Sequence, residues 1–184
     1  MPRYVALLRG VNVGRAKRVP MADWRALLGG LGCEDVRTIL NSGNAVFDSS
    51  ERSAEKLAGL IREAIADKLA VDVPVIVKSE KDLLAIVRGN ELAALATDAS
   101  RLLVAFTRDA GSLAALAALA PLVKAPERFH LGERAAYLWC ADGILASKAA
   151  TALLGKAGRD ATTRNWATVL KIRDLLQGAL DPVN

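Results

Sequence analysis

Apolar and polar positions repeat with two different periods along the chain, and the alternation of these periods predicts its elements. Strand-like composition and period occur in residues 4–9, 36–40, 45–47 and 73–78. Between these segments, residues 21–31 and 53–69 place apolar side chains three or four positions apart, as an amphipathic helix does. The resulting order, strand–helix–strand–strand–helix–strand, is that of a ferredoxin-like unit.

The same order begins again after residue 100. It comprises a strand over 102–107, a helix over 112–122, a hairpin of 128–131 with 135–140, and helices over 147–154 and 165–176, without an obvious last strand. A short helix over 79–88 and a linker candidate over 89–100 separate the two passes. We therefore predict an α+β protein of two ferredoxin-like halves packed as one compact unit. Residues 1–88 form the first half with its short helix, and residues 89–184 form the second half with its C-terminal helices.

Both faces of the first strand are apolar. Val5 and Leu7 lie on one face, and Tyr4, Ala6 and Leu8 lie on the other. A strand of this kind is normally covered on both sides. We expect helices of the first half to cover one face, and the second half or a dimer partner to cover the other. This argues against RNA binding on the open face of the sheet.

The first strand runs directly into a loop of glycine, asparagine and positive charge, Arg9-Gly10-Val11-Asn12-Val13-Gly14-Arg15. In a ferredoxin-like unit this loop and the turn over residues 41–44 lie at the same end of the sheet. We expect that end to bind a ligand through cations, amides, a hydroxyl and exposed backbone, supplied by Arg9, Gly10, Asn12, Gly14, Lys17, Ser42, Gly43 and Asn44. The alternative for the turn is structural, because Asn-Ser-Gly-Asn is good hairpin chemistry by itself.

A second polar cluster precedes the last predicted helix. Thr162 or Thr163 is a natural N-cap, which places Arg164 in the first helical turn. The helix macrodipole disfavours a cation there by roughly 0.3–1 kcal/mol. An anion held by Thr163, Arg164 and Asn165 at the helix start explains this unfavourable choice. Alternatively, Arg164 pairs with Asp160 or extends into water.

Charge and composition limit the choice of partners. The formal net charge is +5 and the isoelectric point is about 9.5, which favours an anionic small molecule or nucleic acid. No apolar run is long enough to span a membrane, and no signal peptide opens the chain, so we expect a cytoplasmic protein without a membrane partner. Cys33 and Cys140 lie far apart and are expected to be buried free thiols. A monomer and a homodimer both stay open.

Catalytic and cofactor signals are sparse. The spacing of Gly10 and Gly14 matches neither known phosphate-binding glycine motif. His130 lies in a predicted strand without a patterned partner, which favours a structural role. No acidic or cysteine residues have metal-ligand spacing. We therefore assign no catalytic residue, no metal and no cofactor from the sequence, and enzymatic activity stays undecided.

Several motifs lie between the first strand and the last helix. They are Tyr4-Val5-Ala6-Leu7-Leu8-Arg9-Gly10-Val11-Asn12-Val13-Gly14, Met21, Val36-Arg37-Thr38, Ser42-Gly43-Asn44, Phe47, Thr163-Arg164-Asn165-Trp166 and Thr168-Val169. Together they resemble the bacterial domain of unknown function family 1697 over nearly the whole chain. The resemblance implies the same two-half architecture, and it implies no reaction, substrate or cofactor.

The chain departs from the family pattern at three positions. Arg15 stands where the family usually has a second glycine, so the loop should be more basic and less flexible than usual. Ile39 replaces a typical aromatic residue, and Asn41 replaces a typical glutamine. A role for an aromatic side chain or a long amide at this end of the sheet is therefore not expected.

Three functions are compatible with these observations. The first is a module that binds a nucleotide, nucleic acid or phosphorylated metabolite at residues 9–15, residues 41–44 and Arg164. The second is an enzyme acting on a small phosphorylated or acidic metabolite at the same site, where the cations stabilise developing charge. The third is a structural or assembly module, in which the same motifs only cap helices and form turns.

Overall fold

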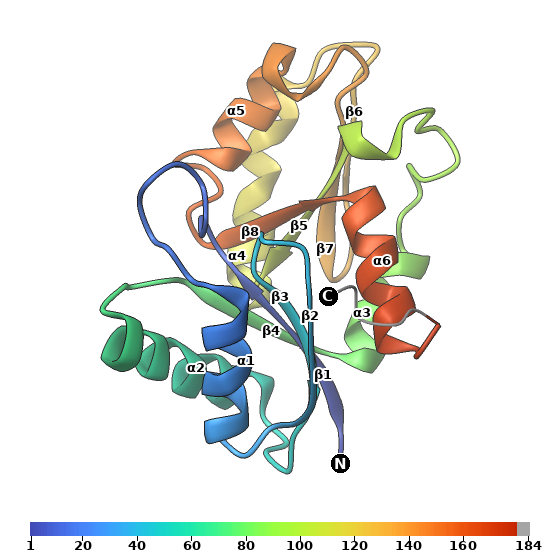
Figure 1. Ribbon diagram of the computed structural model, residues 1–184. Coiled ribbons are helices and arrows are strands. Elements are labelled where there is room, and N and C mark those ends of the chain that lie inside the picture. The colour runs from blue at the N-terminus through green and yellow to red at the C-terminus, as the bar shows by residue number, and fades with distance from the viewer. Residues whose placement is uncertain (180–184) are drawn as a thin grey trace. The chain divides into compact units, whose positions relative to one another are not determined.

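The computed structural model describes residues 1–179, and the chain follows the ferredoxin-like order of elements twice (Figure 1). Two compact units result. The first contains Met1–Leu83 together with the stretch that begins at Lys171, and the second contains Leu84–Leu170. The division of the chain into halves of residues 1–88 and 89–184 stays a prediction.

The first unit contains an antiparallel sheet with the strand order β2-β3-β1-β4. Its strands are β1 (Arg3–Leu8), β2 (Glu34–Ile39), β3 (Asn44–Asp48) and β4 (Val75–Ser79). In the register, Leu7 pairs with Asn44 and Leu8 pairs with Val75. The end of β1 therefore lies beside the beginnings of β3 and β4. The loop after β1 starts at this end of the sheet, and the turn before β3 finishes there.

Two helices accompany this sheet, and the sequence explains where each begins. In α1 (Met21–Gly30), Pro20 occupies the N-cap position, with φ already near the helical value. In α2 (Ala54–Leu69), the Ser53 hydroxyl accepts a hydrogen bond from the Lys56 amide at 3.1 Å. Ala70 then takes a left-handed conformation and ends the helix.

The core of the first unit joins one face of the sheet to these helices. Tyr4, Ala6 and Leu8 of β1 belong to the same buried cluster as Trp24 of α1 and Ile61 of α2. On the opposite face of β1, Val5 and Leu7 have no exposed surface either. The prediction that both faces of the first strand are buried is therefore confirmed.

The second unit repeats the strand order with different strands, β6-β7-β5-β8. These are β5 (Leu102–Thr107), β6 (Arg128–Leu131), β7 (Ala135–Trp139) and β8 (Ala161–Asn165). In both sheets, the first strand in the chain lies between the third and the fourth, and the second lies at the edge. The predicted α+β class with two ferredoxin-like halves is confirmed.

Two helices of the second unit are shorter than α1 and α2. Asp109 caps α4 (Ala110–Ala115), and Ser147 caps α5 (Lys148–Leu154). The predicted helix over 112–122 is instead the end of α4 followed by the 3₁₀ helix η2 (Leu116–Leu122), which contains Pro121. Proline cannot donate the hydrogen bond that an α-helix interior needs, and the tighter helix tolerates this in a short run.

The predicted last helix is confirmed within one residue, but the predicted absence of a last strand and the predicted cap of that helix were wrong. The second unit does have a fourth strand, β8, in which Thr163 pairs with Ala105 and Arg164 pairs with Val104. The last helix, α6 (Trp166–Leu176), begins only after it. Its capping side chain is Asn165, whose Oδ1 accepts a hydrogen bond from the Thr168 amide at 2.9 Å. Arg164 is therefore a strand residue, and the argument from the helix macrodipole does not apply to it.

The predicted short helix near residue 79 and the predicted buried free thiols are confirmed, and Trp166 proves to be a core residue. Ser79 precedes α3 (Glu80–Arg88), and its hydroxyl accepts a hydrogen bond from the Asp82 amide at 3.2 Å. Cys33 and Cys140 are both free and buried. Trp166 is buried, with 8% of its surface exposed. Within residues 1–179, no helix combines the length and the apolar character needed to cross a membrane.

Candidate functional site

The loop after β1 and the turn between β2 and β3 meet in the first unit, as their positions in a ferredoxin-like sheet predict. The Asn12 side chain donates a hydrogen bond to the Asn41 carbonyl at 2.8 Å. One step further down, the Leu8 amide donates to the Gly43 carbonyl at 2.9 Å. Segments about thirty residues apart in the chain thus share one end of the sheet.

Asn12 closes the loop on itself. Its Nδ2 also donates to the Val19 carbonyl at 2.9 Å, and its Oδ1 accepts from the Val19 amide at 2.9 Å. Its backbone amide donates to the Lys17 carbonyl at 3.1 Å, and its φ of 58° is one that asparagine tolerates. Both amide hydrogens of the side chain are engaged by backbone carbonyls. Asn12 therefore shapes the site from within.

Gly43 and Asn44 shape the turn in the same way. Gly43 has a φ of +84°, and a Cβ there would lie 2.6 Å from Leu8 Cβ, so only glycine fits. The Asn44 side chain has no exposed surface. Its Nδ2 donates to the Ile39 carbonyl and to the Ser42 hydroxyl, each at 2.9 Å. These contacts fix the turn that Asn41 extends toward the loop.

Positive charge covers the outer part of the loop. Arg15, Lys17 and Arg18 are exposed, and none of them forms an ion pair with another described residue. Gly10, Gly14 and Lys17 have left-handed backbone conformations. Arg9 is half-buried, and its backbone amide donates to the Pro74 carbonyl at 3.0 Å, which ties the start of the loop to the segment before β4.

A cavity of about 300 Å³ opens where the loop meets the turn. One part of its lining is polar, with Asn12, Asn41 and the cation Arg18. The other part is the run Val19-Pro20-Met21 at the start of α1. Arg18 and Met21 were not among the predicted ligand residues. Both residues line the cavity only because residues 9–20 fold back on themselves, and the sequence alone does not show this conformation.

The third predicted group belongs to the second unit. Thr163, Arg164 and Asn165 are the last residues of β8. Only 8% of Arg164 is exposed, and its Nη1 donates to Thr162 Oγ1 at 3.1 Å and to the Thr163 carbonyl at 3.0 Å. Burial disfavours the charged guanidinium and lowers the pKa of Arg164 to about 10.

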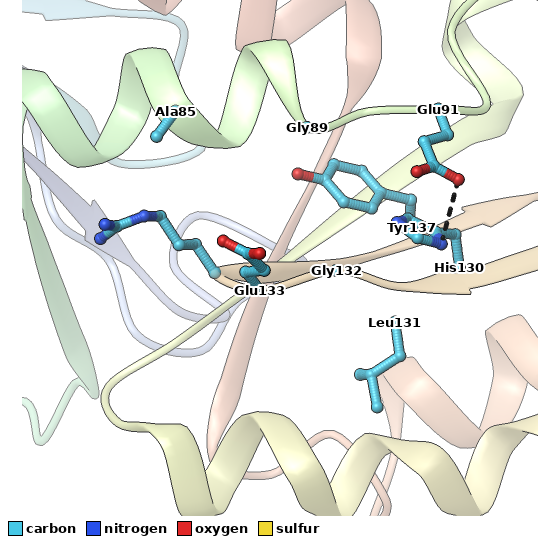
Figure 2. A pocket seen from close by; sticks show the side chains of 9 residues that line it. Ala85, Gly89, Glu91, His130, Leu131, Gly132, Glu133 and Tyr137 are labelled. Atoms are coloured by element: carbon cyan, nitrogen blue, oxygen red, sulfur yellow. Dashed lines mark ion pairs between the residues drawn. The ribbon is translucent and has the colours of Figure 1, made fainter.

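The second unit has a cavity of its own, of about 370 Å³, which the sequence did not indicate. Figure 2 shows the Tyr137 ring beside Gly89, with Glu91 and His130 next to it. His130 Nδ1 lies 3.6 Å from Glu91 Oε2, and the imidazole stacks on Tyr137 with ring centroids 5.8 Å apart. The cross-strand pairing of His130 with Tyr137 follows from the hairpin, whereas Glu91 approaches from an irregular segment without a sequence pattern.

Comparisons with known proteins agree with the fold and name no activity. The family described as "Protein of unknown function (DUF1697)" matches residues 1–137. Among solved structures, a conserved bacterial protein from Streptococcus pneumoniae is similar, with a TM-score of 0.79 and 27% sequence identity. The similarity covers 95% of this chain and 98% of that one. No curated protein matches the sequence.

Proposed function

This chain belongs to the DUF1697 family of proteins of unknown function, and we propose that it binds a small anionic ligand with a phosphate group at the end of the first sheet. The observation that carries the proposal is the cavity of about 300 Å³ that Arg18 lines where residues 9–20 meet the turn before β3. Its volume suits a metabolite or a mononucleotide, because ligand pockets for such molecules are typically about 300–1,000 Å³.

Electrostatics supports an anion at this place. Arg15, Lys17 and Arg18 lie within four residues of each other on an exposed loop, and the chain has a formal net charge of +5. Cations without an ion-pair partner among the described residues attract anions from solution, and a guanidinium binds phosphate through two parallel hydrogen bonds. Asp72, which interacts electrostatically with Lys17, is already paired with Arg62 at 2.8 Å.

The apolar half of the lining selects among anions. Val19 is buried, Met21 is half-buried, and Pro20 holds the backbone rigid between them. A ligand with a base, a ring or an aliphatic chain beside its phosphate would use both halves. Inorganic phosphate would contact only the cations, so we expect a mononucleotide to bind more tightly than free phosphate.

The proposal can be tested by isothermal titration with adenosine monophosphate, inorganic phosphate and a single-stranded oligonucleotide at low and high salt. Loss of one charge-assisted contact is worth about 1.5–3 kcal/mol, so Arg18→Ala should weaken nucleotide binding about 10- to 100-fold. Arg52→Ala is the matched control, because Arg52 is an exposed arginine after β3, at the opposite end of the same sheet. It should bind as the wild type does.

Two results would contradict the proposal. Equal binding by the Arg18→Ala and Arg52→Ala variants would show that the cavity takes no part. Binding of the oligonucleotide alone, with a steep loss at high salt, would instead indicate a polymer that follows the exposed cations. Conversion of a bound compound during the same titrations would support the enzyme alternative.

A further inference from the structure

We propose a second ligand site in the second unit, where the cavity around Tyr137 takes a small organic cation that carries a protonated amine. Residues from two segments line it: the end of α3 with the chain that follows it, and the tip of the β6–β7 hairpin. The site is separate from the anion site in residues, charge and unit, so neither proposal depends on the other.

The residues that line this cavity have a net negative charge, whereas the whole chain has a net positive charge. Glu91, Glu133, Arg134 and His130 all line the cavity, so its net charge is negative when the imidazole is neutral. Glu133 forms no ion pair with another residue of the described chain, and the partner of Glu91 is His130. Figure 2 shows Glu133 on one side of the Tyr137 ring and Glu91 on the other. A cation between them would face carboxylates from two directions.

The walls give the cavity an apolar surface as well. Only 2% of Tyr137 is exposed, and its hydroxyl donates to the Ile86 carbonyl at 2.6 Å, which holds the ring in place. The two glycines of the lining lie close to this side chain. A Cβ at Gly89 would be 3.3 Å from the Tyr137 hydroxyl, and one at Gly132 would be 2.9 Å from Tyr137 Cε2. The aromatic ring therefore reaches the cavity between two positions without side chains.

The segment opposite the hairpin is also held in place. The buried Asn90 side chain accepts a hydrogen bond from the Leu92 amide at 3.1 Å, which fixes the turn that carries Glu91. The Glu91 side chain itself is 73% exposed, so solvent and ligands reach its carboxylate.

An organic cation fits this lining better than a metal ion does. Within residues 1–179, no three His, Cys, Asp or Glu side chains come close enough together to hold a metal. A divalent metal needs several oxygen or nitrogen ligands at about 2.0–2.6 Å. An ammonium group is satisfied by one or two carboxylates, and its hydrocarbon part can contact the Tyr137 ring, Ala85 and Leu131.

Three compounds with the same aromatic ring test whether the cavity prefers a cationic ligand. 2-Phenylethylamine, 2-phenylethanol and phenylacetate are cationic, neutral and anionic at neutral pH, and each would be titrated into ¹⁵N-labelled full-length protein. We expect the amine to shift the amide resonances around Tyr137 and to bind at least about tenfold more tightly than the alcohol. Equal binding of the amine and the alcohol, or tighter binding of phenylacetate, would overturn the proposal.

Charge-neutral variants test the carboxylates. The double variant Glu91→Gln with Glu133→Gln should bind the amine at least about tenfold more weakly. The matched control is Glu63→Gln with Asp67→Asn, which removes two exposed carboxylates from α2 in the first unit and should leave binding unchanged. Should the double variant not fold, the single variant Glu133→Gln gives the same decision, because Glu133 forms no ion pair in the described chain. Unchanged binding in these variants would refute the site.

Discussion

The two units share one strand order but connect their first strand to their first helix in very different ways. In the first unit, residues 9–20 separate β1 from α1. In the second unit, only Arg108 and Asp109 separate β5 from α4, and Asp109 caps the helix by accepting from the Ser112 amide at 2.7 Å. The fold therefore closes with two connecting residues. The longer, basic connection of the first unit is an addition that the sheet does not require.

The additional loop has internal order of its own. Asn12 closes the loop through Val19 and links it to the turn before β3 through Asn41, whereas the contacts of the short connection are the Asp109 helix cap and bonds between neighbouring residues. A loop longer than a fold needs, with a fixed backbone and outward cations, is typical of a binding element on a rigid scaffold. The comparison thus favours function over simple connection for residues 9–20, and three predictions test it.

The largest expected effect concerns the turn beneath the loop. Gly43→Ala places a methyl group 2.6 Å from Leu8 Cβ at a φ of +84°, and we expect it to lower the free energy of unfolding by about 3 kcal/mol or more. Gly14→Ala has a similar φ of +62° but no atom within 4 Å, so it should cost only about 1 kcal/mol. Urea denaturation of both variants measures the difference. Similar losses would mean that the turn does not pack tightly against β1.

The second prediction compares the two connections directly. Asn12→Ala removes three side-chain hydrogen bonds and should cost about 2 kcal/mol. It should also speed hydrogen exchange over residues 9–20. Asp109→Ala removes one helix cap and should cost about 1 kcal/mol, with faster exchange confined to the first turn of α4. Hydrogen exchange measured by mass spectrometry reports both effects. An unchanged exchange rate over residues 9–20 in Asn12→Ala would show that the Asn12 side chain does not hold the loop in place.

The smallest effect separates the loop from the sheet that carries it. At the far end of the first sheet, Arg3 Nε donates to Asp48 at 2.8 Å, and this bond lowers the pKa of Asp48 below its ordinary value. Because the folded-state pKa is lowered, the stabilisation is complete above the unfolded-state pKa and is lost as the pH falls through the folded-state value. Asp48→Asn should therefore cost about 1 kcal/mol at pH 7.

That difference from the wild type should disappear at pH values below the folded-state pKa of Asp48, as urea titrations at several pH values can measure. Nucleotide binding at the other end of the sheet should not change at pH 7. A loss of binding in Asp48→Asn would mean that the loop depends on the stability of the whole sheet. Residues 9–20 would then not be a binding element separate from the sheet.

The sequence predicted the topology because its signals are local. Period and turn residues placed most elements, and the topology then brought Asn12 to Asn41. Strand β8 was missed because Thr162, Thr163 and Asn165 are all good capping residues, and only pairing with β5 shows that the cap is Asn165. The strand position of Arg164 was missed for the same reason.

The two cavities were beyond sequence patterns because they depend on tertiary contacts. Nothing in the spacing of Glu91 and His130 indicates that their side chains lie 3.6 Å apart. Likewise, only the closed loop shows that both amide hydrogens of Asn12 are engaged and that Arg18 lines a cavity instead. Hydrogen-bond partners across a loop are set by its conformation, which residue types constrain but do not determine.

The distribution of cysteine offers a way to observe each unit separately. Cys33 lies in the core of the first unit and Cys140 in the core of the second, and burial raises the pKa of both thiols, that of Cys140 to about 11. The thiolate is the form that attacks an alkylating reagent, so each cysteine reacts only when its own core opens. In Cys33→Ala and Cys140→Ala variants, the labelling rate of the remaining thiol therefore measures how often the core of one unit opens. The chain thus carries a native pair of kinetic reporters, one for the unit with the long loop and one for the unit without it.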